Sequence, residues 1–421
     1  MVQPSAAASA KMVEKRSVQP IVTGPMVRLL VASLGALGSF YLLMPVVPSY
    51  AAAAGAGGVG AGLSTGVLML GTVLAELASP AWIRRYGYRT VISLALLVLG
   101  LPAAVLPISS WPPLVLGVCL VRGAGLGIVF VAGSALAAEL APAGRRSEGL
   151  GLYGAAVGVP SIACLPAGVW LSGHLGYRPV FFAGAVLALL ALLAVPGLPG
   201  RTAPPGSALA GSAPRESALT EPARAQSAPT ATKPDPADVG GLAGPAMVFA
   251  AVALVAGVLL TFLPLSLAAA SHRLAAVALL VQSCTTPLAR WAAGRYGDRY
   301  GGGMLLPAVV AVAMGTAALA WAPNPLAVVA GTALFGIGFG GAQHVTLALM
   351  FARVPTSGFA RASALWNVAY DGGMGIGAVG FGLLLDPIGY SAGFVCTAAV
   401  LITVLVPAWR QRHAGLTGGH A

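Results

Sequence analysis

Residues 294–301 have the sequence Gly-Arg-Tyr-Gly-Asp-Arg-Tyr-Gly, and residues 80–89 repeat part of it as Pro-Ala-Trp-Ile-Arg-Arg-Tyr-Gly-Tyr-Arg. When Gly87 is aligned on Gly301, Arg85 falls on Arg299, and a tyrosine follows each arginine. Each stretch follows the second of six apolar runs in its half of the chain. The sequence therefore predicts two halves that repeat each other.

The composition excludes a soluble enzyme. Of 421 residues, 57% are hydrophobic and only 8% are charged, whereas soluble domains carry about 25% charged residues. A transmembrane helix needs about 20 mostly apolar residues, and twelve runs meet this length. They are residues 27–48, 61–81, 90–108, 113–138, 149–171, 179–198, 245–268, 273–293, 303–322, 325–350, 361–384 and 391–407. We therefore predict an all-α membrane protein with twelve transmembrane helices.

The spacing of the runs divides the chain into five parts. The segment between the two halves is rich in Ala, Pro and Ser and has no apolar periodicity, so we expect a flexible linker. The parts are a cytoplasmic tail (1–25), a six-helix bundle (26–198), a cytoplasmic linker (199–244), a second six-helix bundle (245–410) and a second cytoplasmic tail (411–421).

The basic residues predict the orientation. The net charge is +12. With the N-terminus in the cytoplasm, twenty Lys and Arg residues fall in cytoplasmic segments, Arg290 among them, and two fall outside, Arg178 and Arg273. Such a bias fits the positive-inside rule. The basicity therefore reflects topology, and we expect no nucleic-acid partner.

The pattern Gly294-x-x-x-Asp298-Arg299-x-Gly301 resembles the loop signature of the major facilitator superfamily, and the resemblance extends over about residues 26–410. It implies two bundles of parallel topology that work by alternating access. An Asp–Arg pair in a tight glycine turn can hold helix ends together in one state and release them in another. The gating residues implied are Arg85, Gly87, Arg89, Gly294, Asp298, Arg299 and Gly301. Taken alone, these stretches also fit a helix stop with a basic cluster.

The first-half copy departs from that signature, because Arg84 stands in place of the aspartate and Pro80 in place of the glycine. A charge pair between the halves is therefore weakened or rewired here. Arg122, in the fourth span, resembles the family's membrane-embedded arginine, which is linked with proton coupling. Gly154-x-x-x-Gly158-Val-Pro in the fifth span resembles the signature of drug/proton antiporters, although close packing of small residues explains it equally well.

Four ionisable residues lie inside predicted spans: Asp371, Glu76, Arg122 and His344. A charge at the bilayer centre costs about 2.5–3.5 kcal/mol on insertion scales, so each needs a reason. A carboxylate in a low-dielectric cavity can take up and release protons near neutral pH, which makes Asp371 the first candidate for a proton carrier. The alternatives are structural. Asp371 could pair with Arg122 or His344, Glu76 could pair with a basic loop residue (the repeat aligns it with Arg290), and His344 could be a polar contact between helices.

The substrate-binding candidates share a predicted position near the middle of the spans. Asn367 lies one helical turn before Asp371 on the same face, and Trp366 with Tyr370 could form an aromatic wall. The full set is Asn367, Trp366, Tyr370, Gln343 and Gln282.

The sequence thus favours a secondary transporter that exports a small amphipathic organic compound, a drug or a metabolite, in exchange for protons. The alternatives are an importer of a sugar, an organic acid or an amino acid, and a membrane receptor or scaffold without transport. Intramembrane amides are few, which favours efflux over sugar import. We predict no enzymatic activity, catalytic residue, cofactor or metal, because no P-loop or HExxH pattern occurs and the four cysteines have no ligand spacing. We expect a monomer in the inner membrane.

Overall fold

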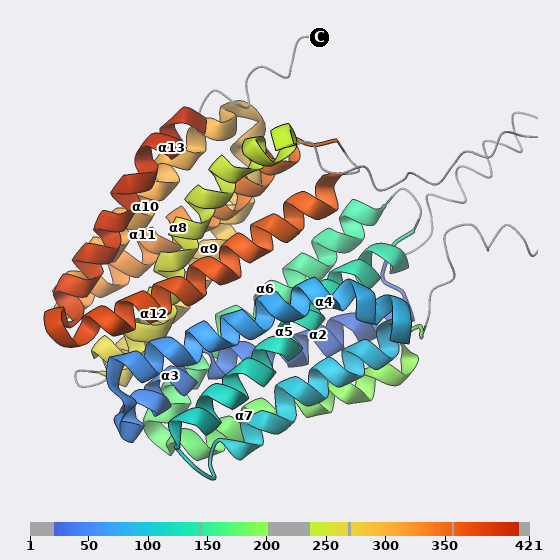
Figure 1. Ribbon diagram of the computed structural model, residues 1–421, viewed down its shortest axis with the longest axis horizontal. Helices are drawn as coiled ribbons and strands as arrows, with labels where there is room; N and C mark the ends of the chain where they lie inside the picture. The colour runs from blue at the N-terminus through green and yellow to red at the C-terminus, as the bar shows by residue number, and fades with distance from the viewer. Residues whose placement is uncertain (1–20, 143–144, 201–235, 268–270, 356–357, 412–421) are drawn as a thin grey trace, which may run out of the picture.

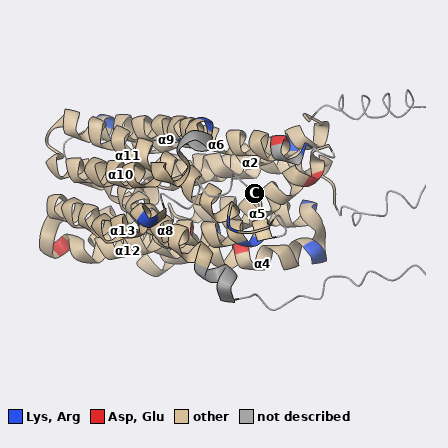
Figure 2. Cartoon of the chain, turned by 90° about the horizontal axis from the view of Figure 1, so that it is seen from above, with Lys and Arg blue, Asp and Glu red and all other residues tan. Residues whose placement is uncertain are grey.

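The computed structural model describes residues 21–142, 145–200, 236–267, 271–355 and 358–411. In these ranges the chain forms helices and no strand, which confirms the predicted all-α class. Most of the predicted tails and most of the predicted linker lie outside the described residues. The few charged residues on the helices stand out against an otherwise uncharged chain (Figure 2).

The first half contains α2 (Gly24–Leu43), α3 (Val46–Ala51), η1 (Ala52–Ala56), α4 (Gly57–Gly100), η2 (Leu101–Val105), α5 (Pro112–Leu140), α6 (Arg146–Leu175), α7 (Tyr177–Leu190) and η3 (Ala191–Gly197). The second half contains α8 (Pro236–Leu267), α9 (His272–Tyr300), η5 (Gly301–Met304), α10 (Leu305–Ala318), η6 (Leu319–Trp321), α11 (Pro325–Phe351), α12 (Phe359–Val400), η8 (Leu401–Val404) and α13 (Leu405–Arg410). Each half forms one bundle in Figure 1.

Two of these helices bend sharply at a glycine. The backbone of α4 breaks at Gly87 (φ 79°), and that of α12 breaks at Gly389 (φ 71°). An unbroken helix of 44 residues, the length of α4, would measure about 66 Å at 1.5 Å per residue, twice the hydrocarbon thickness of a bilayer. A positive φ is accessible to glycine at little cost, so Gly87 and Gly389 allow each helix to consist of two arms.

Eight helical segments are long and apolar enough to cross a membrane, the longest being Gly24–Val105 with 82 residues and Arg361–Arg410 with 50. The protein is therefore a multi-pass membrane protein. The helix α9 is not among the eight, and polar residues, Gln282 and Arg290 among them, interrupt its apolar run. The count of twelve spans and the orientation of the termini stay predictions.

Two helices extend beyond the predicted apolar runs. The helix α8 begins at Pro236, inside the predicted linker of residues 199–244, since proline is tolerated in the first turn of a helix. Arg290, one of the predicted cytoplasmic residues, lies within α9, ten residues before its end at Tyr300.

The repeat that the sequence predicts is present in the packing. In the first bundle, three glycines of α5 lie directly on backbone carbonyls of the two arms of α4, and in the second bundle three glycines of α11 approach α9 and α10 in a similar way. The pairs are Gly123 on Leu68, Gly127 on Thr72 and Gly125 on Ala95, and correspondingly Gly340 on Thr286, Gly338 on Ala308 and Gly336 on the hydroxyl of Thr285. These contacts leave no room for a Cβ atom: one on Gly123 would lie 1.9 Å from the Leu68 oxygen, and one on Gly340 would lie 2.1 Å from the Thr286 oxygen.

The two bundles touch along a seam of small residues between the first arm of α4 and α12. A Cβ atom on Gly62 would lie 2.3 Å from the carbonyl oxygen of Ala378, and one on Gly382 would lie 2.5 Å from that of Gly58. A buried hydrogen bond of 2.9 Å between the hydroxyls of Thr65 and Thr261 joins α4 to α8 beside the seam.

These contacts lie toward one end of the bundles. We call the end that carries the turn at residues 84–89 the arginine end, and the opposite one the distal end. The seam and the Thr65–Thr261 hydrogen bond are distal. There also α6 approaches α9, where a Cβ atom on Gly173 would lie 2.6 Å from the ring of His272. In Figure 1 the ribbons of α4 and α12 lie close together at the distal end and diverge toward the arginine end.

Candidate functional site

Two buried carboxyl groups from different bundles lie near each other. Glu76, on the first arm of α4, is 8% exposed, and Asp371, on α12, is 4% exposed. The two are close enough to interact electrostatically. Glu76 also packs against α5, since its Cγ atom would lie 3.2 Å from a Cβ atom on Gly127. Two buried acids side by side repel each other when both are ionised, and a shared proton relieves the repulsion.

Tyr41 of α2 and Arg290 of α9 join this pair, and the sequence reasoning did not select either of them. Tyr41 interacts electrostatically with both Asp371 and Arg290. Arg290 interacts in the same way with Tyr370 of α12, and its side chain remains exposed. Groups from both bundles therefore surround an accessible guanidinium. The repeat carried a signal for Arg290, because it aligns Arg290 with Glu76, whereas Tyr41 looks like any apolar span residue.

An aromatic stack stands beside the acids in the second bundle. Trp366 and Tyr370, the predicted pair, are parallel within 4° at a centroid distance of 6.0 Å, and Phe249 of α8 stacks on both, 4.4 Å from Trp366 and 5.8 Å from Tyr370. Phe339 of α11 continues the stack, 6.1 Å from Tyr370. The indole Nε1 of Trp366 donates to the hydroxyl of Thr346 at 3.1 Å, which fixes the ring.

The other predicted polar residues lie on three helices. Asn367 of α12 and His344 of α11 are half-buried, and the His344 ring is next to Gly294, 3.3 Å from the position of a Cβ atom there. Gln343 is buried. Gln282 is buried on α9, and its Nε2 donates to the Thr286 hydroxyl at 3.4 Å, while its Oε1 has no hydrogen-bond partner in the described structure. Buried acceptors are normally paired, so Gln282 retains an unused acceptor.

Arg122 is held within the first bundle. Its Nε donates to the carbonyl oxygen of Leu99 at 3.1 Å, and its Nη2 donates to the carbonyl oxygen and the hydroxyl of Ser39, at 3.2 and 3.4 Å. These bonds join α5 to the second arm of α4 and to α2. They satisfy a buried charge with backbone acceptors, so Arg122 has a structural role whether or not its predicted part in proton coupling is correct.

The two glycine turns at the arginine end adopt related conformations. Gly87 and Gly301 both have positive φ, at 79° and 48°, which accounts for the matching glycines in the repeat. Arg85 and Arg89 are exposed, and the Arg85 guanidinium lies 5.3 Å from the ring centre of Tyr86. The side chains of Asp298 and Arg299 lie outside the described part, so the charge pair between them stays a prediction.

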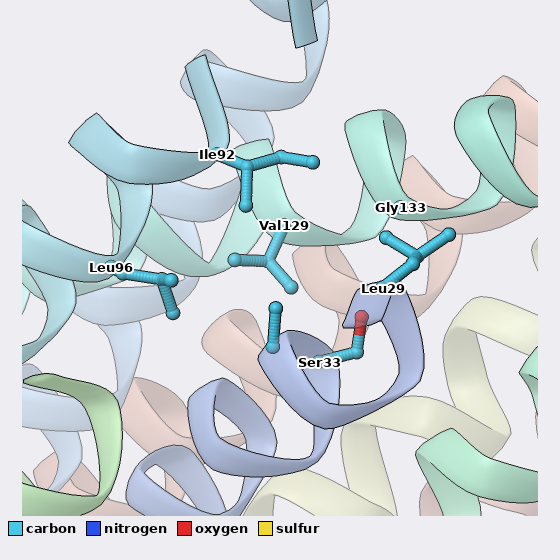
Figure 3. Close-up of a pocket in the computed structure, with 7 residues that line it drawn as sticks. Leu29, Ser33, Ile92, Leu96, Val129 and Gly133 are labelled. Atoms are coloured by element: carbon cyan, nitrogen blue, oxygen red, sulfur yellow. The ribbon is translucent and has the colours of Figure 1, made fainter. Parts of the chain in front are cut away.

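Two small spaces in the described structure have no ionisable residue in their lining, so neither could exchange a proton. One is a packing gap in the first bundle between Leu29, Ser33, Ile92, Leu96, Val129 and Gly133, which is too small for a water molecule (Figure 3). The other, about 150 Å³, lies at the distal end and has an apolar lining apart from Ser110. In the described ranges, no cluster of three or more His, Cys, Asp or Glu residues could hold a metal.

Comparison with known proteins gives one family and one fold. The model of the Major Facilitator Superfamily matches residues 29–325. No curated protein matches the sequence.

Three solved structures illustrate the similarity in fold. A D-xylose–proton symporter has a TM-score of 0.70 at 14% identity, with 92% of this chain and 97% of the other covered. The nucleoside transporter NupG has a TM-score of 0.68 at 12% identity, with 92% and 99% covered. A bacterial homolog of the human lysosomal transporter Spinster, in an inward-facing and unoccupied conformation, has a TM-score of 0.70 at 14% identity, with 94% and 98% covered.

Proposed function

The chain belongs to the Major Facilitator Superfamily, whose members are transporters and not enzymes, and from this premise we propose proton-coupled transport of a small amphipathic organic compound by alternating access. The observation that carries the proposal is the pair of buried acids Glu76 and Asp371. Each bundle contributes one of them, and the two are close enough to interact electrostatically. A proton shared there links the state of charge to the position of the bundles.

The proposed topology has twelve spans with both termini in the cytoplasm. Of the eight apolar segments, the 82-residue segment contains α2 and both arms of α4, and the 50-residue segment contains α12 and the helix after Gly389. Dividing these two gives eleven spans, and α9 supplies the twelfth, because it packs between α6 and α11. The arginine end then faces the cytoplasm by the positive-inside rule, and the membrane is the inner membrane of a bacterial cell.

With this orientation, the structure represents the inward-facing state. The contacts that close the molecule lie at its distal end, in the seam and in the Thr65–Thr261 bond. At the arginine end the inner half of α6 is uncovered: a Cβ atom on Gly151, Gly154 or Gly158 would meet nothing within 4 Å. A ligand therefore reaches the acids from the arginine end.

The first candidate direction is efflux in exchange for protons, of the drug/metabolite antiporter type. The aromatic stack offers an apolar wall for such a compound, and amides near it are few. The second candidate is proton-coupled import of an organic acid. It rests on Arg290, whose exposed guanidinium has no carboxylate within 4.0 Å in the described chain.

Sealed liposomes with an internal pH dye would test the proposed function. Purified protein is reconstituted, a proton gradient is imposed, and aromatic acids, amines, neutral drugs and sugars are added in turn. We expect at least one organic compound to cause a proton movement that empty liposomes do not show. Downhill movement of solutes without any proton signal would refute proton coupling, and the absence of any flux would favour a receptor or a scaffold.

The seam makes a separate prediction about the distal end. Gly62→Leu places a side chain against the Ala378 backbone, so the bundles cannot close there and the hydroxyl contact of Thr261 is lost. Thr261 is fully buried. In a variant without the four native cysteines, we expect Thr261→Cys to resist a membrane-impermeant maleimide applied from the distal side, and to react once Gly62→Leu is added.

The matched control is Gly117→Leu, because Gly117 lies on α5 with nothing within 4 Å of its Cβ position. Thr261→Cys should stay protected in that background. Equal labelling in the two backgrounds would show that the seam does not close the distal end.

A further inference from the structure

The repeat that relates the two bundles places residues of opposite charge at equivalent positions. Glu76 stands eleven residues before Gly87, and Arg290 stands eleven residues before Gly301, so the two occupy equivalent positions with opposite charge. The glycine contacts around them also correspond: Gly127 lies beside Glu76 as Gly340 lies beside the backbone of Arg290. One scaffold thus presents an acid from the first bundle and a guanidinium from the second.

The partner positions are unequal as well. Gly176-Tyr177 and Gly389-Tyr390 are equivalent turns with φ of 79° and 71°. Counting 18 residues back from each glycine pairs Asp371 with Gly158. Helix α12 packs on α4, as α6 packs on α9. The repeat therefore assigns to Gly158 the position toward Arg290 that Asp371 takes toward Glu76. A Cβ atom on Gly158, or on Gly154 one turn earlier, would meet nothing within 4 Å.

By this correspondence, Arg290 faces an open position on α6, whereas the equivalent Glu76 faces an acid on α12. No carboxylate of the described chain lies within 4.0 Å of Arg290, and Tyr41 and Tyr370 are close enough to interact with it electrostatically. A guanidinium presents several N–H donors in a plane and binds a carboxylate with two parallel hydrogen bonds. An arginine inside a membrane protein without a protein acid to neutralise it is suited to an acid from outside.

We propose that the substrate is an amphipathic organic acid, whose carboxylate binds Arg290 in the space beside Gly154 and Gly158 while its apolar body lies against Tyr370 and Trp366. This rests on the proposed transport function and names the substrate class of the same site. Tyr370 connects the two parts, since it contacts Arg290 electrostatically and belongs to the aromatic stack. Gln282, two turns from Arg290 on α9, offers its unpaired Oε1 to a donor on a longer substrate.

Three compounds that differ only in the head group test the charge: 2-naphthoate, 2-naphthamide and 2-naphthylmethylamine. Binding to the full-length protein in detergent is measured by titration calorimetry and by the shift of the melting temperature. We expect the acid to bind and to stabilise the wild type, and the amide and the amine to do so much less. Arg290→Gln should weaken the acid at least about 30-fold, the usual effect of truncating one partner of a charge pair that the ligand buries, and Arg290→Lys should retain part of the binding.

The control is Arg295→Gln, because Arg295 is an exposed arginine on the same helix that lies 5.8 Å from the ring of Trp291. It should bind the acid like the wild type. The proposal is overturned if the amine binds better than the acid, if Arg290→Gln binds the acid unchanged, or if the acid does not bind the wild type.

Transport measurements keep the two proposals separate. If the acid binds through Arg290 but causes no proton movement in liposomes, the substrate class stands and proton coupling fails. If amines or neutral compounds drive proton movement while the acid does not bind, proton coupling stands and the substrate class is wrong.

Discussion

Replacing Asp371 by asparagine is expected to abolish substrate-driven proton movement in liposomes, down to the level of liposomes without protein. Asparagine has nearly the shape of a protonated aspartate but cannot exchange a proton. Asp371 is buried at the contact between the bundles, next to Glu76, so the neutral side chain removes the repulsion without creating a cavity. The variant should therefore fold, bind substrate and remain uncoupled.

Asp386→Asn is the matched control, because Asp386 lies on the same helix and is exposed. It should transport like the wild type. Glu76→Gln distinguishes a shared proton from a single carrier. If both acids hold the proton, either replacement uncouples the protein, whereas normal coupling in Asp371→Asn would make Asp371 structural and leave Glu76 as the carrier.

The second large effect concerns stability. Gly123→Ala introduces a Cβ atom 1.9 Å from the carbonyl oxygen of Leu68, where the obstacle is backbone and cannot rotate away. Overpacking of this kind typically costs 1–3 kcal/mol, and a clash with backbone places the cost at about 3 kcal/mol or more. We expect Gly123→Ala to lower the yield of monodisperse protein and the melting temperature in detergent. Gly340→Ala should have a comparable effect in the second bundle, with 2.1 Å to the Thr286 oxygen.

Gly117→Ala provides the comparison on the same helix, since its Cβ position is open. It should leave the melting temperature unchanged or raise it slightly, because alanine favours a helix by about 1 kcal/mol over glycine. If Gly123→Ala and Gly117→Ala melt alike, the close approach of α5 to α4 is not what holds the first bundle.

The sequence was sufficient to predict the class, the repeat and the family, because all three depend on local composition and spacing. The apolar runs locate helices, and Gly87 and Gly301 mark matching turns. Sequence could not show that Glu76 and Asp371 meet, because they lie in different bundles and only tertiary packing brings them together.

The omissions have physical causes of the same kind. Arg290 follows an apolar run, so the sequence indicates a cytoplasmic residue and gives no sign that Tyr41 and Tyr370 lie near it. Tyr41 was not selected, since a tyrosine in an apolar run gives no sign of its neighbours. Trp366 and Tyr370 were predicted as an aromatic pair from their spacing, but the rings of Phe249 and Phe339 that extend the stack come from other helices.

Because Glu76 and Arg290 differ in charge, the two halves of the duplicated scaffold are not equivalent. If both halves were identical, a twofold axis would pass between the two bundles. A molecule bound on that axis could be turned end over end without a change in its surroundings. One acidic wall and one basic wall remove that equivalence. A molecule with a distinct head and tail then fits in a single orientation, with its head and its tail held by different bundles.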